Sequence, residues 1–191
     1  MAAVLKHELR IYFHSLTAYV FGAFLLTFVG IGAMLYNIQA AVSNFEFVLS
    51  FGSLRAEGYR GVLFDVDNTL VPHGAPADAR AIHLFAHLRE LGMEACLISN
   101  NQRPRVESFA GAVGAYFIEN AHKPGVKNYK KAMELIGCTE KNALFVGDQL
   151  FTDVWGARRT GLYSILTKPM DPHEEIQIVF KRYLEAVVLR A

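Results

Sequence analysis

The sequence has almost no net charge. Its 191 residues contain 19 Lys and Arg against 18 Asp and Glu, which gives a formal charge of +1 at pH 7. A domain that binds nucleic acid usually has a strongly basic face and a positive overall charge. The near balance of charges therefore argues against a nucleic-acid partner. The length is that of one ordinary domain, with room for an additional segment.

Cysteine is also scarce, because the chain has only Cys96 and Cys138. These two residues do not form a C-x-x-C pair, so they support neither a zinc site nor a disulfide framework. Cys96 lies within the apolar run 95–98 and is expected in the core. So few cysteines are most simply explained by a reducing compartment, and we expect the main domain to be cytoplasmic.

Charged side chains are absent from a long stretch near the N-terminus. No Asp, Glu, Lys or Arg occurs between Ile11 and Phe45. An apolar segment of at least about 18 residues is a candidate membrane span, and residues 15–36 are the expected span here. Lys6 and Arg10 precede it, so the positive-inside rule places the N-terminus in the cytoplasm. The alternative is a core helix that is hydrophobic on all sides.

Residues 1–50 also resemble the beginning of a permease subunit of an ABC exporter. The similarity lies in residues 5–21, where a short, charged, amphipathic entry leads into the apolar segment. A permease needs several further spans and none follows, so this resemblance implies a fusion or a truncated reading frame. A single span with a cytoplasmic N-terminus would place the following domain outside, whereas the free cysteines favour the inside. A re-entrant span and a reversed orientation both stay open.

The composition changes at about residue 54. Beyond it, short apolar runs alternate with segments of helical periodicity. The expected strands are residues 61–64, 95–98, 115–118, 143–146 and 163–166. Strands that alternate with helices are typical of βαβ units and of a parallel sheet covered on both faces. We therefore predict an α/β fold with a doubly wound parallel sheet in residues 54–191, and an apolar, transmembrane helix within residues 1–53.

The clearest expected helix covers residues 78–91, with Asp78 as its N-cap. Four apolar residues recur in it at helical spacing and predict one face, and they are Ile82, Phe85, Leu88 and Leu91. His83 and His87 also share a face, but they lack a third ligand for zinc and are expected to be ordinary surface or boundary residues. Further helices are expected at residues 105–113, 125–137, 150–161 and 173–189.

The expected strands end at hydroxyl, amide, lysine and carboxylate side chains. These residues are, in chain order, Asp65, Asp67, Thr69, Ser99, Asn100, Lys123, Asp148 and Asp153. Ligands of an open parallel sheet bind at the carboxyl ends of its strands, where the loops meet. We therefore expect these side chains to converge on one edge of the sheet.

Together, these residue types favour phosphoryl transfer. Two carboxylates from separate strands can hold Mg²⁺, which prefers oxygen ligands and keeps several waters. A carboxylate can also attack a phosphoryl group and form an aspartyl-phosphate, while a lysine and a hydroxyl balance charge on the transferring oxygens. In the pair Asp65 and Asp67, the second carboxylate can give a proton to the leaving group and later take one from water.

The same residues resemble the four motifs of the haloacid dehalogenase superfamily of phosphohydrolases. The matching positions are residues 65–69, Ser99, Lys123 and residues 147–153. Residues 54–185 resemble in particular the YqeG-type branch of subfamily IIIA, which includes the mitochondrial phosphatidylglycerophosphate phosphatases. The resemblance implies a phosphorylated substrate and Mg²⁺ as the cofactor.

The resemblance also implies a role for each position. Asp65 would be the nucleophile and a metal ligand, and Asp67 the general acid and base, with its backbone carbonyl on the metal. Asp148 would be a further metal ligand, and Asp153 would support the metal site directly or through water. The implied phosphate-binding residues, of which the lysine is also catalytic, are Thr69, Ser99, Asn100 and Lys123.

The spacing of the motifs bears on the substrate. The segments 66–98 and 100–122 are too short to hold a separate cap domain over the site. An uncapped site excludes water poorly and suits a bulky substrate that provides its own cover, such as a phospholipid headgroup at a membrane. The family resemblance makes phosphatidylglycerophosphate the expected substrate. The alternatives are a soluble phosphomonoester, or a non-catalytic membrane fusion protein with a phosphate-binding domain.

Other basic and aromatic residues allow two interpretations. Six basic residues could form a rim for anionic lipid, or they could belong to an ordinary solvated face. These residues are Arg103, Arg105, Lys127, Lys130, Arg158 and Arg159. Trp155 lies about one helical turn beyond the expected metal loop. We expect it in the core rather than at a membrane surface.

Overall fold

Six parallel strands form the sheet that supports the described part of the chain. The structure, a computed structural model, describes residues 39–42, 46–171 and 185. The strand order is β1-β6-β5-β2-β3-β4, and each pair of neighbours is parallel. The strands are β1 (Gln39–Val42), β2 (Gly61–Phe64), β3 (Glu94–Ile98), β4 (Tyr116–Ile118), β5 (Ala143–Gly147) and β6 (Tyr163–Thr167).

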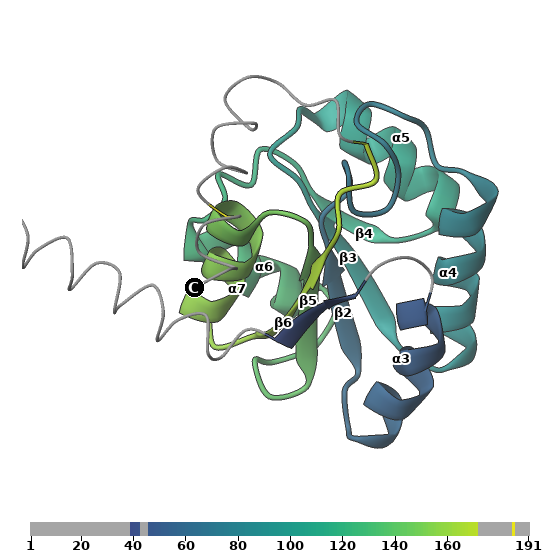
Figure 1. The fold of residues 1–191 in the computed structure, drawn as a ribbon, viewed down its shortest axis with the longest axis vertical. Helices are drawn as coiled ribbons and strands as arrows, with labels where there is room; N and C mark the ends of the chain where they lie inside the picture. The colour runs from purple at the N-terminus through teal and green to yellow at the C-terminus, as the bar shows by residue number, and fades with distance from the viewer. Residues whose placement is uncertain (1–38, 43–45, 172–184, 186–191) are drawn as a thin grey trace, which may run out of the picture. The chain divides into compact units, whose positions relative to one another are not determined.

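Helices cover both faces of this sheet (Figure 1). The helices are α3 (Glu46–Ala56), α4 (Ala79–Glu90), α5 (Arg103–Val113), α6 (Val126–Leu135), the π-helix η1 (Leu150–Val154) and α7 (Trp155–Arg159). Side chains of α3, α4 and α5 pack in one apolar cluster, and those of α6 and α7 pack in another. The predicted α/β fold with a parallel sheet is confirmed, and the five predicted strands match β2 to β6 closely.

Successive strand residues point to opposite faces of the sheet and divide the core in two. In β2, Val62 and Phe64 join the cluster of α3, α4 and α5, whereas Leu63 joins the cluster of α6 and α7. In β5, Leu144 and Phe145 divide in the same way. The period of two is that of a β-strand. Both faces are apolar because helices cover both.

Helix α4 illustrates how the sequence sets the start and the buried face of an element. The side chain of Asp78 accepts a hydrogen bond from the N–H of Ala81 at 2.8 Å, which confirms the predicted N-cap. The buried residues of the helix are Ala81, Leu84, Phe85 and Leu88. Ile82, which we predicted on this face, is 45% exposed. The buried stripe passes through Ala81 and Leu84 and thereby turns Ile82 to solvent.

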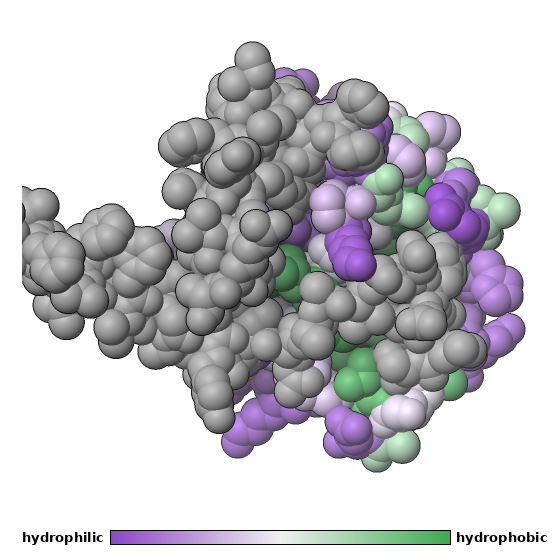
Figure 2. Space-filling view, viewed as in Figure 1, coloured by the Kyte–Doolittle hydropathy of each residue, from purple (hydrophilic) through white to green (hydrophobic). Residues whose placement is uncertain are grey.

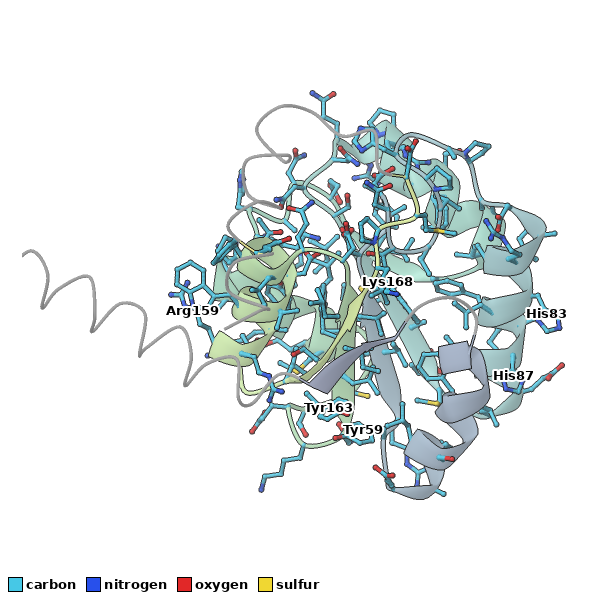
Figure 3. All side chains as sticks on the ribbon, in the orientation of Figure 1. Tyr59, His83, His87, Arg159, Tyr163 and Lys168 are labelled. Carbon is cyan, nitrogen blue, oxygen red and sulfur yellow. The ribbon has the colours of Figure 1, made fainter. Side chains whose placement is uncertain are left out.

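The outer side of α4 faces solvent. Hydrophilic residues predominate along this edge of the molecule (Figure 2), and His83 and His87 point outward from the helix (Figure 3). Within the described part of the chain, no group of three potential metal-binding side chains includes either histidine. His83 is exposed and His87 is half-buried, which confirms the prediction of surface or boundary positions.

The predicted helix at residues 150–161 begins as the π-helix η1 and continues as α7. The prediction that Trp155 lies in the core is wrong, because this side chain is 42% exposed and its ring lies 5.7 Å from the guanidinium group of Arg159. The small residue Gly156 forms the inner side of the helix instead. A Cβ atom there would lie 2.6 Å from the hydroxyl oxygen of Tyr129, so only glycine allows this close approach.

The N-terminal region contains two elements that we did not predict. Strand β1 lies at the edge of the sheet beside β6, within the uncharged stretch of the sequence. Helix α3 crosses the domain boundary that we placed after residue 53, and its Phe51 is fully buried against Phe64. The division of the chain into residues 1–53 and 54–191 stays a prediction.

The predicted membrane span cannot be compared with a described helix. Among the residues that the structure describes, no helix has both the length and the apolar character needed to cross a membrane. The predicted span at residues 15–36 lies outside the described residues. The predicted last helix, residues 173–189, also lies outside them apart from Glu185, which is buried.

Candidate active site

The carboxyl ends of β2 and β5 place two aspartates side by side. Strand β2 ends at Phe64, and the next residue, Asp65, donates its backbone N–H to the carbonyl oxygen of Val146 at 2.9 Å. Strand β5 ends at Gly147, so Asp148 follows at the same edge of the sheet. This is the edge at which parallel sheets bind their ligands.

Three carboxylates form an acidic group at this edge. Asp65, Asp148 and Asp153 are buried, and each offers an oxygen atom within 4.8 Å of the others. The hydroxyl oxygen of Thr69 lies 3.3 Å from an oxygen of Asp65 and 3.2 Å from one of Asp148. A set of carboxylate oxygens is the donor chemistry that Mg²⁺ prefers. The residues present therefore fit the predicted cofactor.

Lys123 lies between two of these carboxylates. Its Nζ atom donates hydrogen bonds to Asp65 at 2.5 Å and to Asp153 at 2.7 Å. Burial opposes the charge of this lysine, but the carboxylates of Asp153 and Asp65 outweigh burial and raise its pKa above the ordinary range. Lys123 is therefore charged, and it neutralises part of the acidic group.

The environment of Asp65 makes its carboxyl group harder to ionise than that of a free aspartate. Burial raises the pKa of this carboxyl group to about 6, although the ammonium group of Lys123 acts in the opposite direction. The negative charge of Asp153 adds to the effect of burial. At neutral pH the group is still mainly ionised, which is the state that a carboxylate needs if it is to act as a nucleophile.

The loop after β5 orients Asp153 by close packing. Its Oδ2 atom accepts a hydrogen bond from the backbone N–H of Gln149 at 3.1 Å. A Cβ atom on Gly147 would come within 2.7 Å of the Asp153 side chain, so this position requires glycine. The side chain of Asp153 is thereby directed towards Lys123 and the other carboxylates.

The π-helix η1, which carries Asp153, is held from two sides. The hydroxyl group of Tyr129 lies 3.1 Å from the carbonyl oxygen of Thr152 and 3.2 Å from that of Asp153. At the start of η1, the carboxylate of Glu185 accepts the backbone N–H of Leu150 at 2.7 Å. A π-helix is rare and occurs frequently at functional sites. Both contacts support η1, and with it Asp153, and neither contact was predicted.

The residues after β3 support the loop that carries Lys123. Ser99 is buried, and its hydroxyl oxygen accepts the backbone N–H of Asn101 at 3.2 Å. The side chain of Asn100 accepts the backbone N–H of Lys123 at 2.8 Å and donates to its carbonyl oxygen at 3.5 Å. Asn100, which we predicted to bind phosphate, thus ties two loops of the site together.

A pocket of about 180 Å³ opens over these residues. It is lined by Asp65, Asp67, Asn68, His73, Ser99, Asn100, Asn101, Lys123, Gln149 and Thr152. Five of the predicted site residues belong to this lining. The other three predicted residues, Thr69, Asp148 and Asp153, are buried within the site.

The pocket also contains five residues that the sequence analysis missed. Asn68, Asn101 and Gln149 each follow a predicted site residue directly, so adjacency to a motif would have indicated them. His73 lies further along the loop after β2 and Thr152 lies in η1, and no local pattern distinguishes them. The path of each loop over the edge of the sheet decides which of its side chains reach the pocket.

Asp67 belongs to a separate group of contacts. Its Oδ1 atom accepts the backbone N–H of Gly74 at 2.7 Å and Nη2 of Arg105 at 2.9 Å, and its Oδ2 atom accepts the amide of Asn101. Its carboxylate is not part of the acidic group formed by the three other aspartates. The metal contact through its backbone carbonyl stays a prediction. Arg105 is paired with a site residue, so it is not free to act in the proposed lipid rim.

The chain is similar to known phosphatases in sequence. Residues 77–161 match the family model of the haloacid dehalogenase-like hydrolases. Over 139 residues the chain is 34% identical to "Probable phosphatase YqeG" of Bacillus subtilis (strain 168), which covers 72% of this chain and 81% of that protein. Over 184 residues it is 26% identical to "Phosphatidylglycerophosphate phosphatase 1, chloroplastic/mitochondrial" of Arabidopsis thaliana. That match covers 85% of this chain and about half, 53%, of the relative.

A solved structure is also similar. The 3-deoxy-D-manno-octulosonate 8-phosphate phosphatase from Moraxella catarrhalis, in complex with a magnesium ion, a phosphate ion and its sugar, has a TM-score of 0.47 at 15% identity. The similarity covers 59% of this chain and 70% of that one. The relative from Bacillus subtilis is matched at more than 30% identity over most of its length. The chain belongs to the haloacid dehalogenase-like hydrolases and is an enzyme of the phosphatase type within that family.

Proposed function

We propose that this protein is a Mg²⁺-dependent phosphomonoester hydrolase that acts through an aspartyl-phosphate on Asp65. The observation that carries the proposal is the position of Asp65. It lines the pocket, it lies 2.5 Å from Lys123, and it belongs to the group of three carboxylates. A nucleophilic carboxylate needs a nearby cation if it is to approach an anionic phosphate.

In the first step, an oxygen of Asp65 forms a bond to phosphorus while the bond from phosphorus to the leaving oxygen breaks. Asp67, in its protonated form, gives its proton to that oxygen. In the second step, Asp67 takes a proton from water as the water oxygen bonds to phosphorus. The bond between Asp65 and phosphorus then breaks, and inorganic phosphate is released. Both aspartates return to their starting state.

The other site residues bind and balance charge. Lys123 lies where its ammonium group can offset the negative charge on the transferring oxygens, and Ser99 lines the same pocket. Mg²⁺ held by Asp65, Asp148 and Asp153, with the backbone carbonyl of Asp67, would lower the repulsion between carboxylates and phosphate. Asn100 keeps Lys123 in place through its backbone contacts.

We propose phosphatidylglycerophosphate as the substrate and phosphatidylglycerol as the product. The similarity to a relative named as a phosphatidylglycerophosphate phosphatase supports this choice. The connections from β2 to β3 and from β3 to β4 contain α4 and α5 respectively, with no inserted domain in either. A pocket without such a cap can receive the phosphate group of a large molecule. We place the catalytic domain in the cytoplasm, at a membrane reached through residues 15–36.

The test measures phosphate release by the full chain in detergent. The substrates are phosphatidylglycerophosphate in mixed micelles and, separately, glycerol 3-phosphate as a soluble phosphomonoester. We expect release that depends on Mg²⁺, that is faster with the lipid, and that Asp65→Asn abolishes. Faster turnover of the soluble compound would contradict the lipid substrate and keep the chemistry. No Mg²⁺-dependent turnover of either would favour the non-catalytic phosphate-binding alternative.

A further inference from the structure

Three segments of the chain converge on the carboxyl group of Asp67. Gly74, in the loop after β2, donates its backbone N–H at 2.7 Å. Arg105, in the first turn of α5, donates Nη2 to the same oxygen, Oδ1, at 2.9 Å. Asn101, in the loop after β3, donates its side-chain amide to the other oxygen, Oδ2. One oxygen therefore has two donors, including a charged one, and the other has a single neutral donor.

We propose that Arg105 is a positioning residue of the phosphatase reaction, because it holds the carboxyl group of Asp67 in the orientation in which Oδ2 exchanges a proton with the substrate. The inference rests on the proposed function, which makes Asp67 the proton donor and acceptor. Oδ1 is engaged by Arg105 and Gly74, and charge-assisted hydrogen bonds are the stronger ones. Oδ2 is thus the oxygen that can carry a transferable proton.

Asn101 suits this arrangement. Its side-chain amide contains both a donor and an acceptor. The amide can donate to Oδ2 of the ionised carboxylate, and after turning over it can accept from the protonated form. Arg105 has donors only, so it can serve Oδ1 in either state but cannot accept a proton from it. The two residues therefore distinguish the two oxygens of Asp67.

The surroundings of Arg105 favour one orientation of its side chain. Its guanidinium group lies 5.6 Å from the ring of Phe109, one turn further along α5. The side chain of Arg105 is 23% exposed and that of Asp67 is 11% exposed, so solvent screens this ion pair only partly. Arg105 does not belong to the pocket lining. It therefore acts through Asp67 and not by contact with the substrate.

Arg103 provides a matched control on the same helix. Its side chain is 62% exposed, and it pairs with Glu107 at 3.0 Å and lies 3.9 Å from Glu119. Neither of these partners is Asp67 or a residue of the pocket lining. Removal of its charge tests the loss of an arginine from α5 without the loss of a contact to the site.

The leaving group separates positioning from a general structural effect. An alkoxide is strongly basic and must be protonated as it leaves, whereas p-nitrophenolate is a good leaving group without a proton. The orientation of Asp67 therefore matters for an alkyl phosphate and matters little for p-nitrophenyl phosphate. A damaged fold or a weakened metal site would slow both substrates alike.

The experiment compares kcat/KM of the full-length wild type, Arg105→Met and Arg103→Met on p-nitrophenyl phosphate and on the better alkyl phosphate of the assay above. For Arg105→Met we expect a loss of about 10- to 100-fold on the alkyl phosphate, a part of what a general acid supplies. The loss on p-nitrophenyl phosphate should stay within about threefold, by the same principle. Arg103→Met should match the wild type on p-nitrophenyl phosphate and on glycerol 3-phosphate, neither of which offers a lipid surface to a basic rim. Equal losses on the two substrates, or none, would overturn the proposal.

Two further variants keep the test decisive. If Arg105→Met does not fold, Arg105→Lys replaces it in the test. This variant retains the charge but not the fork of donors. It should show a smaller loss of kcat/KM that is again selective for the alkyl phosphate. In an Asp67→Asn background, Arg105→Met should cause no additional selective loss, because the group that it orients is already gone. An additional selective loss there would contradict a role through Asp67. If the wild type hydrolyses neither substrate, the proposed function itself fails.

Discussion

At the scale of single residues, Asp65 combines its proposed role as the nucleophile with an unfavourable position. Burial raises the pKa of its carboxyl group to about 6, from 3.8 for the free side chain. The folded protein therefore binds more protons than the unfolded chain between these pH values. Its stability falls as the pH rises through this range and remains lower above it. The proposed nucleophile is thus a point of weakness in the metal-free fold, as is common for active sites.

The substitution Asp65→Asn should stabilise the metal-free protein. In EDTA at pH 7.5 we expect a higher thermal unfolding midpoint than in the wild type, because the amide removes a buried charge. The difference should shrink as the pH is lowered towards about 4, where the carboxyl group of the folded wild type is protonated and no longer carries a buried charge. The exposed substitution Glu107→Gln serves as the control. A lower midpoint for Asp65→Asn at pH 7.5 would mean that the ion pair with Lys123 outweighs burial.

At the scale of elements, the π-helix η1 links the C-terminal part of the chain to the site. Glu185 accepts the N–H of Leu150 at 2.7 Å and that of Phe151 at 3.4 Å, and so satisfies two free donors at the start of the helix. Asp153 lies within the same helix. A shift of η1 would therefore move Asp153 relative to Asp65 and Lys123.

We expect Glu185→Ala to lower the apparent affinity for Mg²⁺ more than it lowers the stability of the fold. The concentration of Mg²⁺ that gives half-maximal activity should rise several-fold, because the start of η1 loses its acceptor. Glu185→Gln keeps a carbonyl oxygen at this position and should lie between the alanine variant and the wild type. Titration of activity with Mg²⁺ measures the effect. An unchanged half-maximal concentration would show that η1 holds its position without Glu185.

At the scale of the whole molecule, the acidic group exists only because the sheet forms. Asp65 and Asp148 come from loops far apart in the chain, and the parallel pairing of β2 with β5 brings them together. An ion that binds this group binds the folded state and not the unfolded chain. Metal binding should therefore stabilise the entire fold by mass action.

Addition of Mg²⁺ should raise the thermal unfolding midpoint of the wild type. At a concentration of about 100 times the Kd, the gain corresponds to about 2.7 kcal/mol. Asp148→Asn should abolish the shift, because one of the three carboxylates is lost, whereas the exposed Glu107→Gln variant should retain it. The measurement is thermal unfolding in a series of Mg²⁺ concentrations. A full shift in Asp148→Asn would contradict the assignment of this residue to the metal site.

The sequence by itself determined the order of the elements from β2 to β6 and most of the candidate site. Apolar runs such as residues 61–64 indicate buried parallel strands, because helices cover both faces of the sheet. The side chains that follow those runs, among them Asp65, Lys123 and Asp148, had to meet at one edge once the strands were parallel. Local pattern and topology together sufficed for these predictions.

Only the tertiary structure decided which residues support that site. The pairs formed by Asp67 with Arg105 and by Leu150 with Glu185 join segments more than thirty residues apart, with no local periodicity to connect them. The exposure of Trp155 likewise depends on how closely α7 approaches its neighbour. Such contacts are set by how helices and loops pack against the sheet, and this packing is a property of the folded chain as a whole.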